Sequence, residues 1–203
     1  MRVLVACEFS GVVRDAFTDA GHDALSCDLL PTDSPGAHYI GDVRDVLYDG
    51  WDLMIAHPPC TYLANSGVRW LHEKPGRWEL LDQGAELFKT LLEAPIDRIA
   101  VENPIPHKYA VERIGRKYDQ LIQPYQFGHP ETKATCLWLK NLDPLKETNN
   151  VLHLKESLPD KDWQRIHYLS PGPERTKLRS KTYSGIARAM VEQWHAKSVS
   201  NER

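Results

Sequence analysis

Cys60 follows two prolines in the stretch MIAHPPCTYL, residues 54–63. Proline fixes φ and has no backbone N–H, so Pro58 and Pro59 cannot extend a regular strand, and each keeps the preceding residue out of the helical region. We therefore expect a short buried strand that ends in a stiff loop with a thiol at its tip. Such a cysteine is either a small packing residue or a nucleophile, because the thiolate is intrinsically very reactive. The double proline favours the nucleophile.

Glu102, in the stretch VENP, is the natural companion of that thiol. A glutamate at the tip of a central strand is costly to bury unless it holds a proton or has a partner. With a raised pKa, Glu102 would be a general acid that hydrogen-bonds a heterocycle nitrogen. The alternative is a salt-bridged loop carboxylate. Asn103 and Pro104 would fix the direction of the glutamate side chain.

The alternation of apolar runs and amphipathic stretches indicates how these residues are positioned. Because the two kinds of segment alternate and are joined by short loops, the pattern predicts an α/β fold with a parallel or mostly parallel sheet in a three-layer sandwich. Strands are expected at 2–9, 23–30, 51–60, 97–104, 120–129 and 134–142, and helices at 12–22, 79–93, 108–115 and 185–197.

Length and composition limit the number of domains. A chain of 203 residues with 41% hydrophobic and 26% charged residues is typical of one globular core. We expect a single catalytic domain over residues 1–197, in which 143–181 is irregular with short helices, and a disordered tail at 198–203. The formal net charge of −3 gives no overall electrostatic signature of a nucleic-acid-binding protein.

The cysteine pattern and the start of the chain indicate the compartment. The four cysteines are scattered with no C-x-x-C pair, which argues against a zinc site or a disulfide framework and suits a reducing cytosol. Cys7, Cys27 and Cys136 lie in apolar runs, so we expect them to be buried packing residues. With no apolar leader and no long apolar segment, the expectation is a cytoplasmic protein without a membrane span and without a metal.

Several polar groups fall where predicted strands end. Ligands of open α/β sheets bind beyond the carboxyl ends of the strands. The turn EFSG, residues 8–11, has a glycine that allows close backbone approach, although it is not a G-x-G-x-x-G fingerprint. Asp28 ends the second strand, where an acid can bind ribose hydroxyls or simply cap a turn. Asp42 lies in a loop on the same edge and has the same two interpretations.

In this order, the motifs resemble those of the C5-cytosine DNA methyltransferases. FSG at 9–11 resembles the first cofactor loop, GDV at 41–43 the loop that meets the adenine amine, PPC at 58–60 the nucleophile motif, and ENP at 102–104 the Glu-Asn-Val motif. GHPETKATCLWL at 128–139 is similar to a strand pair that carries two arginines, and TYSGIARAM at 182–190 occupies the place of the last cofactor motif.

The resemblance implies a fold, a cofactor and a reaction. The fold would be the Rossmann-like three-layer sandwich of the S-adenosylmethionine-dependent methyltransferase type. Cys60 would attack C6 of cytosine, and Glu102 would stabilise charge at N3 while C5 receives the methyl group. The cofactor S-adenosyl-L-methionine would contact Phe9, Ser10, Gly11, Asp28, Asp42, Val43 and Pro58.

This sequence also departs from the family pattern. The two arginines would fall at Lys133 and Thr135, Thr61 replaces the usual glutamine after the cysteine, and Ile186 replaces the usual asparagine of the last motif. Residues 143–181 stand where the family has a large target-recognition domain, and flipping a base from a duplex normally needs protein to hold the strands. The chain therefore resembles a short form of these methyltransferases. Such a form would act alone, as a homodimer, or with an accessory recognition subunit.

A basic run supplies candidate contacts to the substrate. In PERTKLRSKTY, residues 173–183, basic and uncharged residues alternate, which suits phosphates or a solvated loop. The segment GHPETK adds a histidine and a lysine. With the asparagine of the ENP motif, the candidate substrate-binding residues are Asn103, His129, Lys133, Arg175 and Arg179.

Three functions remain open from the sequence. The leading one is methylation of C5 of cytosine in DNA. The same chemistry on a free pyrimidine nucleotide would suit the absence of a recognition domain and the mild acidity. A catalytically silent relative that binds nucleic acid is the third, and the presence of both Cys60 and Glu102 argues against it because a binder needs neither.

Overall fold

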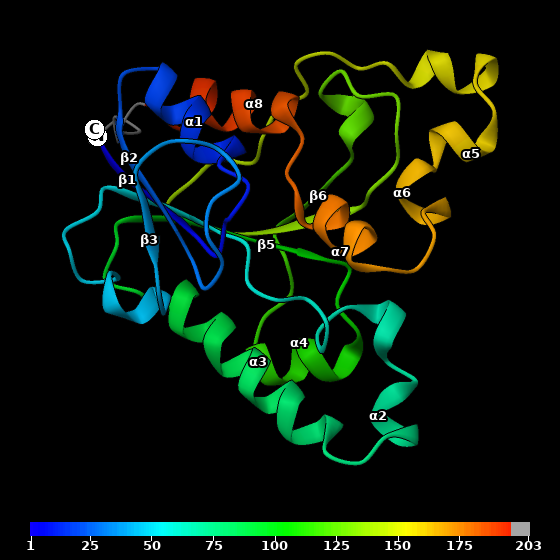
Figure 1. The fold of residues 1–203 in the computed structure, drawn as a ribbon, viewed down its shortest axis with the longest axis horizontal. Coiled ribbons are helices and arrows are strands. Elements are labelled where there is room, and N and C mark those ends of the chain that lie inside the picture. Colours follow the sequence, from blue (N-terminus) through cyan, green and yellow to red (C-terminus); the bar gives the residue numbers. More distant parts are fainter. Residues whose placement is uncertain (196–203) are drawn as a thin grey trace, which may run out of the picture.

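The computed structural model describes residues 1–195, so the tail expected at 198–203 lies outside the described residues. A seven-stranded sheet forms the centre of the molecule, with the strand order β3-β2-β1-β4-β5-β7-β6 (Figure 1). The strands are β1 (Arg2–Ala6), β2 (Asp23–Asp28), β3 (His38–Ile40), β4 (Leu53–Ala56), β5 (Arg98–Pro104), β6 (Gln120–Ile122) and β7 (Thr135–Lys140).

The sheet is mostly parallel. Strands β1 to β5 run in one direction, and β7 runs antiparallel to both of its neighbours, β5 and β6. The central strands are apolar on both faces, as expected of a sheet that is covered on both sides. Their carboxyl ends meet at one edge, and this order and direction are those of the expected Rossmann-like methyltransferase sandwich.

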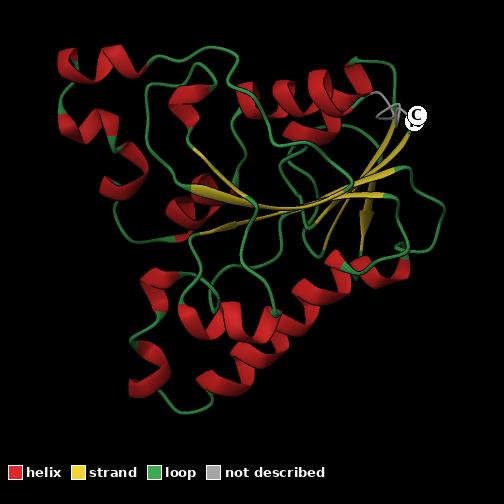
Figure 2. Ribbon diagram, turned by 180° about the vertical axis from the view of Figure 1, so that it is seen from behind, coloured by secondary structure: helices red, strands yellow, loops and turns green. Residues whose placement is uncertain are grey.

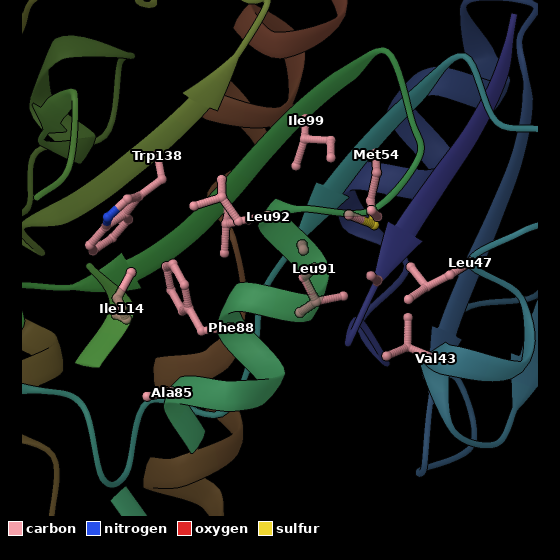
Figure 3. Packing of buried hydrophobic residues seen from close by; sticks show 14 of the residues in the cluster. Val43, Leu47, Met54, Ala85, Phe88, Leu91, Leu92, Ile99, Ile114 and Trp138 are labelled. Carbon is pink, nitrogen blue, oxygen red and sulfur yellow. The ribbon is translucent and has the colours of Figure 1, made fainter. Parts of the chain in front are cut away.

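Helices cover the two faces of the sheet and complete the three layers (Figures 1 and 2). On one face, α1 (Val12–Asp19) packs on α8 (Ser184–Trp194), above Val3, Val5 and Ile55. On the other face, α3 (Arg77–Leu92) packs on α4 (Lys108–Ile114). Figure 3 shows this second core, in which Phe88 of α3 meets Trp138 of β7 edge to face with ring centroids 4.8 Å apart.

Two local differences from the sequence-based expectation have physical causes. β3 lies in the stretch expected to be a loop. Its three residues pair with β2 at the edge of the sheet and are not fully buried, so the sequence has no apolar run there that would indicate a strand. β6 ends at Ile122 instead of continuing to His129, since Pro124 lacks the N–H that a strand needs and starts a 3₁₀ turn.

The segment 143–181 contains four short helical stretches. They are a 3₁₀ helix (Leu152–Ser157), α5 (Asp160–Trp163), α6 (Arg165–Tyr168) and α7 (Pro173–Ser180). A further short helix, α2 (Trp70–Glu73), lies between β4 and α3. None of the helices in residues 1–195 has both the length and the apolar character that crossing a lipid bilayer requires.

A buried arginine of α1 connects the sheet to the loop 31–37 that follows β2. The Arg14 side chain is 1% exposed and pairs with Asp15 at 2.7 Å. Its guanidinium also donates to Ser26 Oγ on β2 and to Thr32 Oγ1 and the Ser34 carbonyl in the loop. The loop is therefore attached to the sheet edge by one side chain.

We predict that Arg14→Met lowers the free energy of unfolding by about 2–3 kcal/mol, because methionine leaves buried acceptors without a donor. The matched control is Arg44→Met, which removes an exposed pair with Asp42 and should cost less than about 1 kcal/mol. Urea denaturation of both variants measures the difference. Equal losses would show that Arg14 does not have this role.

Candidate active site at the carboxyl edge of the sheet

A cavity of about 900 Å³ opens at the carboxyl ends of β1, β4 and β5. Its wall includes Cys60 and Glu102 together, so the two residues singled out from the sequence share one space. A volume of this size falls within the range of small-molecule sites. The other walls come from the β1–α1 turn, the segment 61–77, the residues just before β7, and α6 and α7.

Backbone and side-chain hydrogen bonds hold the loop that carries Cys60. The Cys60 carbonyl accepts from the N–H groups of Leu63 and Ala64 at 3.0 and 2.9 Å, which makes a tight turn. The Asn103 Nδ2 donates to the Pro58 carbonyl at 3.2 Å and attaches the first proline to β5. The thiol is partly exposed at the end of this rigid loop.

The Cys60 thiol is not pre-activated. Burial raises its pKa, and the nearby negative charge of Glu102 raises it further. The positive charges of Arg179 and Lys133 act in the opposite direction but do not outweigh burial. In this state the sulfur therefore keeps its proton at neutral pH.

His57 is the direct partner of Glu102. Its Nδ1 lies 2.9 Å from the Glu102 Oε2, and the two side chains are only 9% and 13% exposed. Burial alone would raise the pKa of Glu102, but the hydrogen bond from His57 and the positive charge of Lys133 hold that pKa below its usual range. The expected raised pKa of Glu102 is thus corrected: the carboxylate is ionised because the imidazole N–H and Lys133 stabilise its charge.

Sequence reasoning missed His57, although it directly precedes the double proline. Two buried polar atoms of this region, the His57 Nε2 and the Asn103 Oδ1, have no hydrogen-bond partner within residues 1–195. Asn103 is 1% exposed and holds Pro58 through its other amide atom. It therefore stabilises the cysteine loop, while His57 orients the carboxylate.

The β1–α1 turn combines cavity-lining residues with a filled helix terminus. Phe9 and Ser10 line the cavity. The Glu8 carboxylate accepts from the N–H groups of Val13 and Arg14 at 2.8 and 3.2 Å, so it occupies the anion-binding N-terminus of α1. Gly11 is the N-cap, with φ of +75°, and a Cβ there would lie 2.5 Å from the Arg14 guanidinium.

The expected adenosine contacts are not part of the cavity lining. Asp28 ends β2 and accepts from the Leu30 N–H at 2.9 Å. Asp42 pairs with Arg44 at 2.6 Å, and this bond together with the Arg44 N–H keeps the pKa of Asp42 below its usual range. Val43 is buried in the core.

His129 caps a helix and does not line the cavity. Its Nε2 accepts from the Gly185 N–H at the start of α8, at 2.9 Å. Burial lowers its pKa, which suits an acceptor role. Glu131, two residues later, accepts from Tyr183 and from Arg165 of α6, both at 2.9 Å. The segment GHPETK therefore joins α6 and α8 to the sheet edge.

Helix α7 forms one wall of the cavity and is anchored to the loop 31–37. Lys177 and Lys181 lie 2.8 and 3.0 Å from the carboxylate of Asp33, and their hydrogen bonds lower the pKa of Asp33. Arg179, between them, lines the cavity together with Lys133, whereas Arg175 does not. Of the expected substrate contacts, the cavity thus brings together Asn103, Lys133 and Arg179.

No protein-family model matches the sequence, and no curated protein matches it. Solved structures do match it. A prophage-encoded E. coli protein that is assigned as a DNA modification methyltransferase is 15% identical over 79% of this chain and 56% of that one, with a TM-score of 0.47. The methyltransferase EhMeth of Entamoeba histolytica is 14% identical over 74% and 57%, with a TM-score of 0.44. This chain thus spans little more than half of each neighbour, and the sheet topology itself defines the fold.

We predict that Glu102→Gln speeds the alkylation of Cys60 by iodoacetamide at pH 8 by roughly two- to tenfold, because removing a negative charge lowers the thiol pKa. Arg179→Met should slow it, since it removes a charge that favours the thiolate. Peptide mass spectrometry measures the rates. Cys27 is the internal control, because burial raises its pKa to about 12 and neither substituted residue is among the causes of that shift. A slower Cys60 in Glu102→Gln would contradict this electrostatic account.

Proposed function

We propose that this chain is a methyltransferase that uses S-adenosyl-L-methionine to methylate C5 of cytosine, with DNA as its leading substrate. The observation that carries the proposal is the meeting of the Cys60 thiol and the Glu102 carboxylate in one cavity. C5 of cytosine is a poor nucleophile until a group adds to C6. A thiol on a rigid loop beside a carboxylate supplies the group that adds to C6.

The protonation states of the two groups suggest how the addition occurs. Cys60 holds its proton and Glu102 is ionised. As the sulfur bonds to C6, the S–H bond breaks and Glu102 accepts the proton. Glu102 then gives that proton to N3, where negative charge develops. The S–C6 and N3–H bonds form, the C5–C6 double bond is lost, and no external acid is needed.

The proposed cofactor has residues that suit it. Phe9, Ser10 and Pro58 line the cavity. Asp28 offers a partly exposed carboxylate for hydroxyl groups, and Leu29 next to it is 74% exposed, an apolar surface of the kind that a planar base covers. When bound, S-adenosyl-L-methionine would supply an electrophilic methyl group. Asp42 would contact the cofactor only if its carboxylate exchanged the ion pair with Arg44 for a bond to the cofactor.

The surroundings of the cavity determine which forms of cytosine need a partner protein. Residues 143–181 form short helices at its rim, and α7 is one wall. A duplex substrate would require a second copy of the chain or an accessory recognition subunit to hold the strands. Single strands and free nucleotides need no such partner. The cytoplasm is the proposed place of this activity, since free nucleotides and S-adenosyl-L-methionine occur there.

A free pyrimidine nucleotide is the second candidate substrate. It needs no partner to hold strands, and the basic side chains that line the cavity, Lys74, Arg77, Lys133 and Arg179, would suit its phosphate. A catalytically silent relative would need neither a thiol beside a carboxylate nor a cofactor site. The covalent test below separates that alternative from the two enzymatic ones.

We predict that the protein with S-adenosyl-L-methionine forms a covalent adduct with 5-fluorocytosine, because the fluorine at C5 cannot leave as a proton does. Cys60→Ser should form none, and Glu102→Gln should reduce adduct formation even though its thiol is alkylated faster. Intact-mass spectrometry with duplex, single-stranded and mononucleotide substrates identifies both adduct and substrate. No adduct with any of the three would refute the proposed chemistry.

We also predict that Asp28→Ala weakens the binding of S-adenosyl-L-methionine about tenfold or more, since hydrogen bonds to a charged carboxylate contribute about 1.5–3 kcal/mol. Titration calorimetry measures the affinity. Asp19→Ala, at the far end of α1, is the control and should bind as the unchanged protein does. Equal affinities in both variants would remove Asp28 from the cofactor site.

A further inference from the structure

The cavity collects positive charge in a protein that is acidic overall. The chain has a formal net charge of −3. Yet four cationic side chains line the cavity, from three separate parts of the chain: Lys74 and Arg77, Lys133, and Arg179. Clefts that are lined by one sign of charge attract ligands of the opposite sign. The distribution therefore points to an anionic ligand.

The four cations outnumber the acidic side chains in the same wall. Glu8 and Glu102 are the two carboxylates that line the cavity. Glu8 is hydrogen-bonded to the N-terminus of α1 and Glu102 to His57. Both negative charges already have partners.

Within the described part of the chain, neither Lys133 nor Arg179 forms an ion pair with a carboxylate. The Lys133 Nζ donates to the Lys181 carbonyl at 3.1 Å and lies 5.8 Å from the Tyr183 ring centroid. Its position is thus fixed, and Glu102, whose pKa its positive charge lowers, lies beyond ion-pair distance of it. Lys74 and Arg77 lie over the rings of Trp70 and Tyr62, at 4.3 and 4.5 Å from the centroids.

Helix α7 is held in place without the use of Arg179. Lys177 and Lys181 are four residues apart, so they share one side of this helical segment and both reach Asp33. Arg179 lies midway between them and lines the cavity. The two lysines anchor the wall, and the arginine is left to bind a ligand.

The cations that would bind the ligand also act on the reactive sulfur, so the charge of the ligand must lie near it. Arg179 and Lys133 both favour the thiolate of Cys60, so their charges act at the position of the nucleophile. Guanidinium and ammonium groups are suited to phosphate oxygens. A cavity of about 900 Å³ has room for a nucleotide whose ring lies over Cys60 and whose phosphate lies toward these cations.

We propose that Arg179 and Lys133 form a phosphate subsite that binds the phosphate ester of the pyrimidine nucleotide whose ring reaches Cys60. This inference rests on the proposed function for the identity of the ring. The phosphate belongs either to a free nucleotide or to a nucleic-acid strand, and the two sources present the same group to the same cations. A nucleoside without phosphate is a poor ligand.

Titration calorimetry on the full chain tests the subsite, with dCMP, deoxycytidine, inorganic phosphate and a single-stranded cytosine oligonucleotide as probes. We expect Arg179→Met and Lys133→Met each to weaken dCMP binding about tenfold or more and to leave deoxycytidine within about twofold. The matched control is Arg188→Met on the exposed side of α8, which removes the same charge outside the cavity and should change nothing.

The outcomes separate the subsite from the proposed reaction. Unchanged dCMP affinity in the Arg179 and Lys133 variants, or an equal loss for deoxycytidine, overturns the subsite, as does absence of binding to both dCMP and the oligonucleotide. Binding of the oligonucleotide alone, lost in Arg179→Met, supports a strand as the source. A charge-dependent dCMP affinity without a Cys60 adduct supports the subsite while refuting the proposed reaction.

Discussion

The hydrogen bond between His57 and Glu102 is the interaction on which the site depends. β4 and β5 are parallel with Ala56 opposite Val101, so the next residue of each strand, His57 and Glu102, lies at the same level. Ile55 and Ala100, two residues earlier, both belong to the core beneath α1 and α8, which places both side chains on that face. The register of two buried strands therefore fixes an ionised carboxylate at the edge of the sheet.

An ionised Glu102 and a protonated Cys60 are two aspects of one electrostatic balance. The carboxylate charge that His57 and Lys133 stabilise is the same charge that disfavours a thiolate. A phosphate at Arg179 and Lys133 would weaken the cationic support for a thiolate further. Transfer of the thiol proton to Glu102 during bond formation avoids a free thiolate at any stage. The proposed phosphate subsite and proton transfer are thus compatible.

The sequence predicted the elements that local patterns define. The apolar runs of β1, β4 and β5 and the periodic faces of α1, α3 and α8 identified the α/β sandwich, and strand ends indicated Cys60 and Glu102. Pairings of distant residues could not be read in this way. His57 and Glu102 are 45 positions apart, and Asp33 pairs with Lys177 of α7 far along the chain, so only the folded chain shows these partners. His129 looked like a substrate contact, but its acceptor nitrogen caps α8.

The segment 143–181 shows how a short stretch can form part of a cavity wall without a core of its own. Four helical stretches this short are marginal as isolated helices, so their stability must come from attachment to the rest of the molecule. Glu131 binds Arg165 of α6, and Asp33 binds Lys177 and Lys181 around α7. Glu131 lies shortly before β7. Asp33 lies on the loop 31–37, and Arg14 of α1 ties this loop to β2. Attached in this way, α6 and α7 close one side of the cavity of about 900 Å³ that contains Cys60 and Glu102.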